Sequence, residues 1–427
     1  MNKYNSIFTN PKFRFGIKYI SLIFILIYLI NCLTPLRLHV DTIRYFAIKD
    51  CIEIGCPPDS FGANDYLPYG YTGLLLALSK ANILNSFTIV LINCICLFIS
   101  IYLIKRLFGK SLNFNLFLLL LLLNWTVLKF TVHPLSELLY LLFSVSSLYF
   151  FNIFLKNKKT LYILLSLVFA TFSFITRTIG ITLFAAIFIT LIWNYRIELF
   201  NLLRKNKIIT ISVALLFILG LLFSKELGLN HYTGVFSKQM SEGKTLTNTI
   251  KGHFIEWAEI SYNTSVAKIN TQLHTDLVMP FFLISGVLFF GIFIYLLVKK
   301  INKIPLAITL YIIFYSVLIF TWPFYDPRFW VPLIPFILVV FVQNLSTLKI
   351  SRIRNLVLVP SFILYSIMGV LSVGFLTYTS LSKEKLAKTQ ANGVYRNEYE
   401  TYFFGKPLSD TAKKIDTGIL SLLKRHN

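Results

Sequence analysis

Long apolar runs separated by short polar connections fill most of the chain. Eleven runs are predicted as spanning helices, near residues 17–36, 86–104, 113–130, 135–155, 160–176, 178–195, 208–227, 278–298, 304–322, 329–345 and 356–378. Each run falls within the roughly 17–25 residues with which a helix crosses a bilayer. These runs do not alternate apolar and polar residues as the strands of a membrane barrel do. The pattern therefore predicts an all-α polytopic membrane protein with about 11 transmembrane helices.

The distribution of charge orients this bundle in the membrane. The chain has 41 Lys and Arg against 18 Asp and Glu, and a formal net charge of +23. Counting Lys18, 20 of the 41 basic residues fall in or beside the short connections 1–16, 105–112, 156–159, 196–207, 299–303 and 346–355, which hold one acidic residue, Glu198. Short basic loops stay in the cytoplasm, which predicts a cytoplasmic N-terminus and an external first loop. The positive charge is thus a topology signal, and nucleic acid is not expected as a partner.

The same orientation divides the chain into a membrane domain, 1–378, and a short external tail, 379–427. The first run lacks a small-residue cleavage site after it, so we expect a retained helix and not a signal peptide. The first external loop, 37–85, has apolar residues at helical spacing over 41–54 and 71–84, which predicts two amphipathic helices on the outer membrane surface. The second external loop, 228–277, is expected to be polar and broken by its glycines.

Two of the five cysteines, Cys51 and Cys56, lie in the first external loop. An oxidising compartment favours a disulfide between them, and free thiols are the alternative. A zinc site is not favoured, because no second Cys or His pair accompanies them. Cys32, Cys94 and Cys96 fall in apolar runs, where buried thiols are expected.

Asp41 is the candidate for chemistry in the first loop. It follows the first apolar run by a few residues, and Tyr45 comes one helical turn later. A carboxylate held by a helix end suits a general base or a metal ligand, and a helix N-cap is the simpler alternative. Asp65 and Tyr71 are further candidates, in a segment that is also typical of a turn with an interfacial aromatic residue.

Two further connections bring ionisable residues to the same outer face. His133 and Glu137 lie between the third and fourth runs, and Arg177 lies between the fifth and sixth. An ionisable residue at this depth usually faces the interior of the bundle. Glu137 suits either substrate orientation or stabilisation of its helix N-terminus, and Arg177 suits either an anion or a pair with Glu137.

A last connection, before the tenth run, carries Tyr325, Asp326 and Arg328. Arg328 suits a phosphate, and a pair with Asp326 is the alternative. With Asp41 and Arg177 on the same side of the membrane, acid, base and anion-binding groups converge near one interface. This convergence predicts a reaction on a lipid-anchored phosphate.

The order of five short motifs resembles a known group of enzymes. The motifs are D-x3-Y from Asp41, P-x-G-Y ending at Tyr71, P-x-S-E ending at Glu137, R-x2-G from Arg177 and R-F-x2-P-x2-P from Arg328. This order resembles bacterial integral-membrane glycosyltransferases of the GT-C fold, whose relatives include the protein O-mannosyltransferase and lipid A aminoarabinose transferase families. The resemblance covers the first six runs and the region around Arg328.

The resemblance implies an enzyme of the plasma (inner) membrane, surrounded by membrane lipids, with an extracytoplasmic active site. Its sugar donor would be linked to polyprenyl phosphate, and its acceptor would be a glycan, lipid or protein on the outer face. Asp41 matches the family's first-loop aspartate, the base or acceptor-orienting group, although many relatives carry a second acidic residue where this chain has Thr42. Arg177 and Arg328 would neutralise the departing phosphate, with inversion at the sugar. Some relatives use a divalent metal, Mg²⁺ or Mn²⁺, for which Asp41 would be the ligand. Substrate binding is assigned to Tyr45, Asp65, Tyr71, His133, Glu137, Arg177, Tyr325 and Arg328.

Two other classes of protein fit parts of the pattern. A polymerase or ligase of lipid-linked glycans would place its chemistry in a larger late external loop, such as 228–277. A flippase or transporter would need polar residues near the bilayer midplane and broken helices in paired halves, and the sequence offers few of these. The sequence contains no Walker loop, nucleotide fingerprint, HExxH or GxSxG motif.

Overall fold

The computed structural model describes residues 11–57, 60, 62–63, 65, 67–205, 229–299, 304–345, 359–408 and 414–427. These residues are mostly helical and include no β-strand, which confirms the all-α prediction. In chain order the helices are α2 (Pro11–Ile30), α3 (Val40–Ile54), α4 (Tyr69–Lys80), α5 (Ser86–Phe108), α6 (Phe114–Leu122), α7 (Trp125–Thr131), α8 (Glu137–Asn157), α9 (Thr160–Thr176), α10 (Ile181–Lys205), α12 (Leu229–Ser241), α13 (Leu246–Tyr262), α14 (Val266–Leu273), α15 (Val278–Lys299), α16 (Leu306–Thr321), α17 (Ile334–Leu345), α19 (Val359–Leu381), α20 (Lys383–Thr389), α21 (Arg396–Phe404) and α22 (Thr417–His426). Short 3₁₀ segments join some of them: η1 (Asn31–Leu33), η2 (Gly109–Ser111), η3 (Thr178–Gly180), η4 (Pro327–Trp330) and η6 (Gln390–Gly393).

The described helices include those of a multi-pass membrane protein. Six segments are long and apolar enough to cross a membrane: Phe15–Leu33, Ser86–Ser111, Glu137–Asn157, Thr178–Ile197, Val278–Lys299 and Pro360–Leu381. A seventh results if α6 and α7 form one broken span, and α9, α16 and α17 are apolar but shorter. The predicted run 208–227 lies outside the described residues. Each of the other predicted runs overlaps one long helix, except 113–130, which overlaps two.

The predicted helix over 113–130 is in fact two helices, α6 and α7, bent by 64°. Asparagine side chains satisfy the backbone groups that the bend exposes. The side chain of Asn124 accepts a hydrogen bond from the Val127 amide (3.1 Å), and that of Asn263 accepts one from Trp125 (2.8 Å) and donates to the Leu123 carbonyl (2.8 Å). Because Asn263 is remote in sequence, the apolar pattern alone predicted an unbroken helix.

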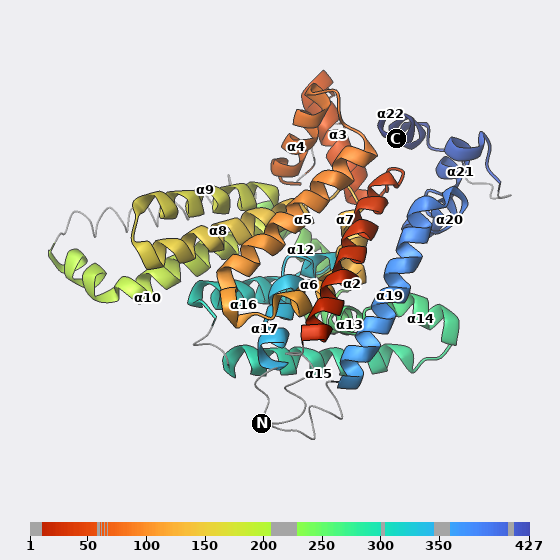
Figure 1. Ribbon diagram of the computed structural model, residues 1–427. Helices are drawn as coiled ribbons and strands as arrows, with labels where there is room; N and C mark the ends of the chain where they lie inside the picture. Colours follow the sequence, from red (N-terminus) through yellow and green to blue (C-terminus); the bar gives the residue numbers. More distant parts are fainter. Residues whose placement is uncertain are drawn as a thin grey trace.

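The first loop forms the two predicted helices, α3 and α4, at one end of the molecule (Figure 1). Cys51 and Cys56 form a disulfide at the C-terminal end of α3, which decides between the two alternatives for this pair. The tail returns to this end, because the Tyr399 hydroxyl accepts a hydrogen bond from the Leu38 amide (2.9 Å). The tail and the first loop therefore lie on the same side of the bundle (Figure 1).

The segment 228–277, expected as a polar loop, instead contains α12, α13 and α14 among its described residues. α13 packs against α15 so closely that a Cβ on Gly286 would lie 1.7 Å from the Phe254 carbonyl oxygen. Gly252, expected to break the chain, lies inside α13 and makes room for the ring of Tyr325, 2.7 Å from its ideal Cβ. α13 was assigned to a polar external loop from the sequence because the face that this helix buries is itself partly polar.

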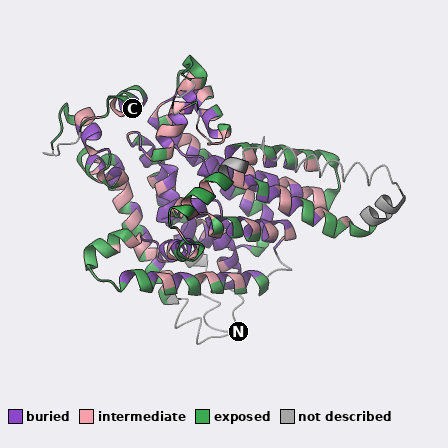
Figure 2. Cartoon of the chain, turned by 180° about the vertical axis from the view of Figure 1, so that it is seen from behind, coloured by how far each residue is buried: buried purple, intermediate pink, exposed green. Residues whose placement is uncertain are grey.

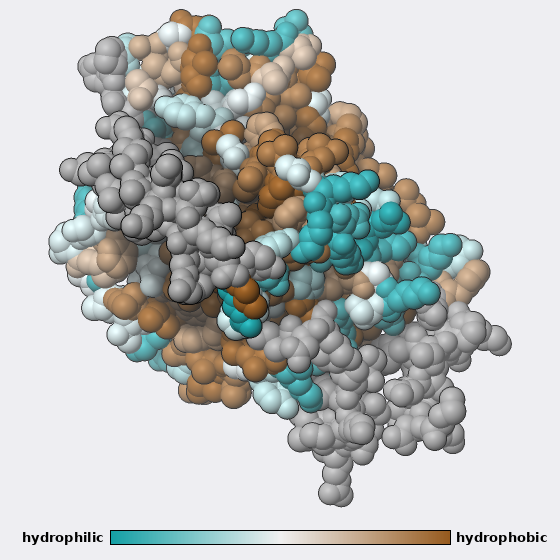
Figure 3. All heavy atoms as spheres, turned by 90° about the vertical axis from the view of Figure 1, so that its left-hand side faces the viewer, coloured by the Kyte–Doolittle hydropathy of each residue, from teal (hydrophilic) through white to brown (hydrophobic). Residues whose placement is uncertain are grey.

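Burial concentrates where the long helices cross, and the outer faces of the peripheral helices are exposed (Figure 2). α8, α9 and α10 extend to one side of the molecule (Figure 1). Many exposed side chains on these helices are large and apolar, including Leu161, Phe188 and Trp193. Seen from this side, much of the described surface is apolar (Figure 3), as expected for helices in contact with lipid.

Candidate functional site

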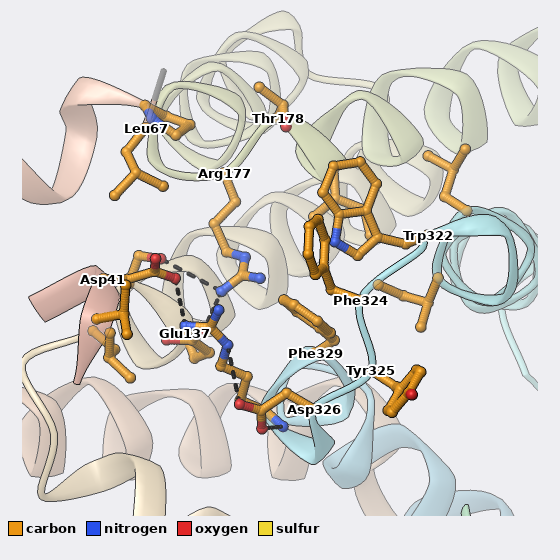
Figure 4. A pocket seen from close by; sticks show the side chains of 18 of the residues that line it. Asp41, Leu67, Glu137, Arg177, Thr178, Trp322, Phe324, Tyr325, Asp326 and Phe329 are labelled. Atoms are coloured by element: carbon orange, nitrogen blue, oxygen red, sulfur yellow. Dashed lines mark hydrogen bonds and ion pairs between the residues drawn. The ribbon is translucent and has the colours of Figure 1, made fainter. Parts of the chain in front are cut away.

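A cavity of about 800 Å³ lies where the starts of α3 and α8, the η3 turn and the segment 318–329 meet. Its charged side chains gather on one wall, and the aromatic side chains of Trp322, Phe324 and Phe329 face them (Figure 4). The cavity thus combines an ionic wall with an apolar one. A molecule with a charged head and an apolar body would fit both.

Asp41 lies in the first turn of α3, on the ionic wall. The N-cap prediction for Asp41 is wrong, because His39 caps this helix and its Nδ1 accepts a hydrogen bond from the Asp41 amide (3.2 Å). The Asp41 carboxylate instead forms ion pairs with Arg328 (2.6 Å) and Arg44 (3.0 Å). Burial opposes ionisation of Asp41, but Arg328 and Arg44 together outweigh it and hold its pKa below the ordinary value. Asp41 is therefore ionised in the free protein.

The two arginines that hold Asp41 each have a second carboxylate. Arg44 binds Asp65 through two hydrogen bonds, of 2.7 and 2.6 Å. Arg328 lies 3.5 Å from Asp326, whose other oxygen accepts a hydrogen bond from the Arg328 amide. The chain of ion pairs therefore runs from Asp65 through Asp41 to Asp326.

A second pair, Glu137 with Arg177, lies beside this chain and confirms one of the alternatives for these two residues. Glu137 begins α8, and its carboxylate is only 1% exposed. Ser136 links the pair to α3, because its hydroxyl lies 3.0 Å from the Tyr45 hydroxyl and accepts a hydrogen bond from Arg177 (3.4 Å). Tyr45 is thus linked through the Ser136 hydroxyl to Arg177, which positions this pair relative to α3 and Asp41.

The glycine of the P-x-G-Y motif, Gly70, lies where there is no room for a side chain. A Cβ at this position would lie 2.7 Å from the carbonyl oxygen of Ile175 and from Thr176, at the end of α9 that precedes Arg177. Only glycine lets α4 approach this backbone so closely. The next residue, Tyr71, is buried with its ring 5.0 Å from that of Tyr45. α4 therefore packs against the backbone that precedes Arg177 and against the ring of Tyr45, and so helps to position both residues.

Most of the residues predicted for the site meet at the cavity. Its lining includes Asp41, Tyr45, Glu137, Arg177, Tyr325 and Arg328. Asp65 and Tyr71 do not line the cavity but contact Arg44 and Tyr45, which do.

His133 also lies outside the lining. Its Nδ1 donates to the carbonyl oxygen of Lys129 (2.6 Å), and its Nε2 lies 3.1 Å from the side-chain nitrogen of Gln390 in the tail. Burial lowers the pKa of His133 well below the ordinary value. A neutral ring in these contacts joins the bundle to the tail.

The sequence prediction missed two polar residues of the ionic wall, His39 and Arg44. Arg44 follows Asp41 by three residues in a helix, so the i, i+3 rule could have identified it. His39 precedes the helix, and its distance of 3.9 Å from Asp326 depends on a contact between remote segments. Sequence spacing could not reveal that contact.

The residues of the cavity do not fit a divalent metal. Among the described residues, no group of three or more His, Cys, Asp or Glu side chains is arranged to hold one. Both oxygens of Asp41, the predicted metal ligand, face guanidinium groups. The cavity is suited instead to an anion that exchanges places with a carboxylate.

The sequence matches no model of a known protein family, and comparisons with characterised proteins and with solved structures find no significant match. The chemistry of the cavity is therefore the basis for a functional proposal.

Proposed function

We propose that the protein is a membrane glycosyltransferase of the GT-C type, which moves a sugar from a polyprenyl-phosphate donor to an acceptor on the extracytoplasmic face. The observation that carries the proposal is the meeting of Asp41, Arg177 and Arg328 in one cavity with an apolar wall. A carboxylate beside two guanidinium groups supplies a base for the acceptor and cations for a leaving phosphate. The apolar wall suits the lipid part of the donor.

Each arginine that lines the cavity is already paired with a carboxylate, so a phosphate has to displace one of these carboxylates. If the phosphate displaced Glu137 from Arg177, a carboxylate that is 1% exposed would lose its counter-charge, which is costly. If it displaces Asp41 from Arg328, Asp41 still keeps Arg44. The exchange therefore occurs at Arg328.

The same exchange prepares Asp41 for its role. Once Arg328 turns to the phosphate, Asp41 loses one of the two cations that lower its pKa, so it becomes a stronger base. Asp41 takes the proton of the acceptor hydroxyl, whose oxygen bonds to the anomeric carbon. The bond from that carbon to the phosphate oxygen breaks on the opposite face, and the phosphate leaves with the electron pair beside Arg328. This step inverts the configuration at the sugar.

The extracytoplasmic location has two supports. The short connections with excess Lys and Arg lie at the ends of the spanning runs opposite the first loop, which favours a cytoplasmic position for them. The disulfide between Cys51 and Cys56 needs an oxidising compartment, such as the outer side of a plasma membrane. We further propose that α9, α16, α17 and the run 208–227 also cross, which brings the count to about 11.

The decisive experiment is a transfer assay with purified protein in nanodiscs and a panel of polyprenyl-phosphate sugars. Wild type should transfer the sugar or hydrolyse a donor, and Asp41→Asn should not. Asp50→Asn, which removes a partly exposed carboxylate from the same helix, should behave as wild type. Full activity in both Asp41→Asn and Asp41→Ala would show that Asp41 is not the base. Binding of long lipid-linked glycans without turnover of any donor would instead favour a polymerase or a flippase.

A further inference from the structure

The segment from Trp322 to Trp330, which carries Arg328, is held in place at both ends by side chains of α13, a contact that we call the fastening. His253 Nε2 lies 2.9 Å from the carbonyl oxygen of Trp322. Glu256 Oε2 accepts a hydrogen bond of 2.7 Å from the indole nitrogen of Trp330. One turn of α13 therefore contacts both ends of the segment.

His253 and Glu256 also contact each other, through Nδ1 and Oε2 at 2.7 Å. Both ring nitrogens thus face oxygen atoms. A neutral imidazole has one N–H and one lone pair, so it cannot donate to both oxygens. The contacts are satisfied if the ring is an imidazolium, or if Glu256 is protonated and donates to Nδ1. Either arrangement holds one proton more than a neutral ring beside a carboxylate.

The surroundings of this pair favour the extra proton. His253 is 0% and Glu256 3% exposed, so a lone charge on either would be costly. Burial raises the pKa of Glu256 in spite of its hydrogen bonds, and the negative charge of Asp326 acts in the same direction. Glu259, one turn further along α13, is a second buried acidic residue, and the nearby cation Lys129 acts to lower the pKa of Glu259. An anionic form of the pair would therefore face two more carboxylates.

We propose that His253 and Glu256 are positioning residues that share one proton and thereby hold the 322–330 segment where Arg328 meets Asp41. If the proton leaves, the one remaining ring N–H bonds the Glu256 carboxylate, which is a stronger acceptor than a carbonyl. The Nε2 lone pair then faces the Trp322 carbonyl oxygen, and this contact becomes repulsive. Raising the pH therefore loosens the segment. The link to phosphate binding rests on the proposed function, but the fastening itself does not require a donor.

Hydrogen–deuterium exchange of the peptide 322–330 tests the fastening without any substrate. After correction for the intrinsic pH dependence, wild type should lose protection by about tenfold as the pH rises, as for one lost hydrogen bond of about 1.4 kcal/mol. Glu256→Gln should lack this protection at every pH, because one amide atom cannot both accept from the Trp330 indole and donate to His253 Nδ1. An amide oxygen would accept from both, which leaves His253 Nε2 without a proton for the Trp322 carbonyl. His253→Gln should also lack this protection at every pH, because a side-chain amide cannot contact both Glu256 and the Trp322 carbonyl oxygen as the two ring nitrogens do.

Glu259→Gln is the matched control. Glu259 is a buried acid of the same helix, but its carboxylate accepts a hydrogen bond from the Val266 amide (2.6 Å), away from the segment. This variant should keep wild-type protection of 322–330 at a fixed pH. Protection of the α15 peptide in each variant shows that the fold is intact, and the pH response of wild type needs no variant at all.

Binding of a long-chain polyprenyl phosphate connects the fastening to function. Glu256→Gln should raise KM for the donor by several-fold and change kcat less, because Arg328 is misplaced while Asp41 is intact. Equal protection of 322–330 in wild type, Glu256→Gln and His253→Gln at all pH values would overturn the inference. Loosening as expected in a wild type that binds no polyprenyl phosphate would support the fastening and refute the proposed function.

Discussion

Replacing Asp41 by Asn should have opposite effects on donor binding and on transfer. The amide keeps the size of the side chain but loses its charge, so Arg328 loses the nearer of its two carboxylates. Transfer should stop, because the amide cannot accept the proton. Binding of polyprenyl phosphate should become tighter, because the phosphate no longer competes with a carboxylate for Arg328.

The ion-pair geometry sets the size of this effect. Asp41 Oδ2 and Arg328 Nη1 are 2.6 Å apart, and the two side chains are 15% and 13% exposed. Charges about 4 Å apart attract each other by about 4 kcal/mol at an effective dielectric constant of about 20. Desolvation and the remaining Asp326 offset part of this, so we expect a net competition of about 2 kcal/mol, equal to about thirtyfold in affinity.

Titration of purified protein in nanodiscs with polyprenyl phosphate measures this affinity, and uncharged polyprenol controls for the apolar contribution. Asp326→Asn should tighten binding less than Asp41→Asn, because Asp326 lies 3.5 Å from Arg328. Asp50→Asn controls for the change in net charge and should leave the affinity unchanged. If Asp41→Asn binds the phosphate as wild type does, or more weakly, the phosphate does not take Arg328 from Asp41 and the exchange mechanism is wrong.

Three further predictions concern the parts of the fold that support the site. Gly70→Ala should lower the melting temperature and the activity, with a loss of about 1–3 kcal/mol from overpacking, whereas Gly73→Ala, with nothing within 4 Å of its ideal Cβ, should be neutral or stabilising. Burial raises the pKa of Glu259 to about 7 from 4.5, so the folded state binds the proton more tightly than the unfolded state, and Glu259 should make stability fall as the pH rises through this range. Melting temperatures across this pH range should depend less on pH in Glu259→Gln, and an unchanged slope would contradict the assignment. A membrane-impermeant maleimide should not label wild-type cells but should label Cys56 of Cys51→Ser; absence of labelling there would place the loop on the inner side.

The positions of the helices were predictable from sequence because apolar length is a local property. Each predicted run within the described residues overlaps one long helix, or, over 113–130, the bent pair of α6 and α7. The clustering of Asp41, Glu137, Arg177 and Arg328 was predictable for a related reason. Their connections alternate with predicted spanning runs, and this order predicts the same side of the membrane for all four. Sequence order and sidedness together therefore predicted most of the cavity's ionic wall.

Only the tertiary structure decided which carboxylate binds which arginine, and which polar segment is buried. The pairs Asp41 with Arg328 and Glu137 with Arg177 join residues far apart in the chain, so no local spacing encodes them. α13 was expected to be part of a surface loop because polar residues recur along it. Its buried face is satisfied by hydrogen bonds to distant groups, as His253 shows with Trp322. Periodicity reports where apolar side chains lie, whereas a buried polar face depends on partners that only the folded chain brings together.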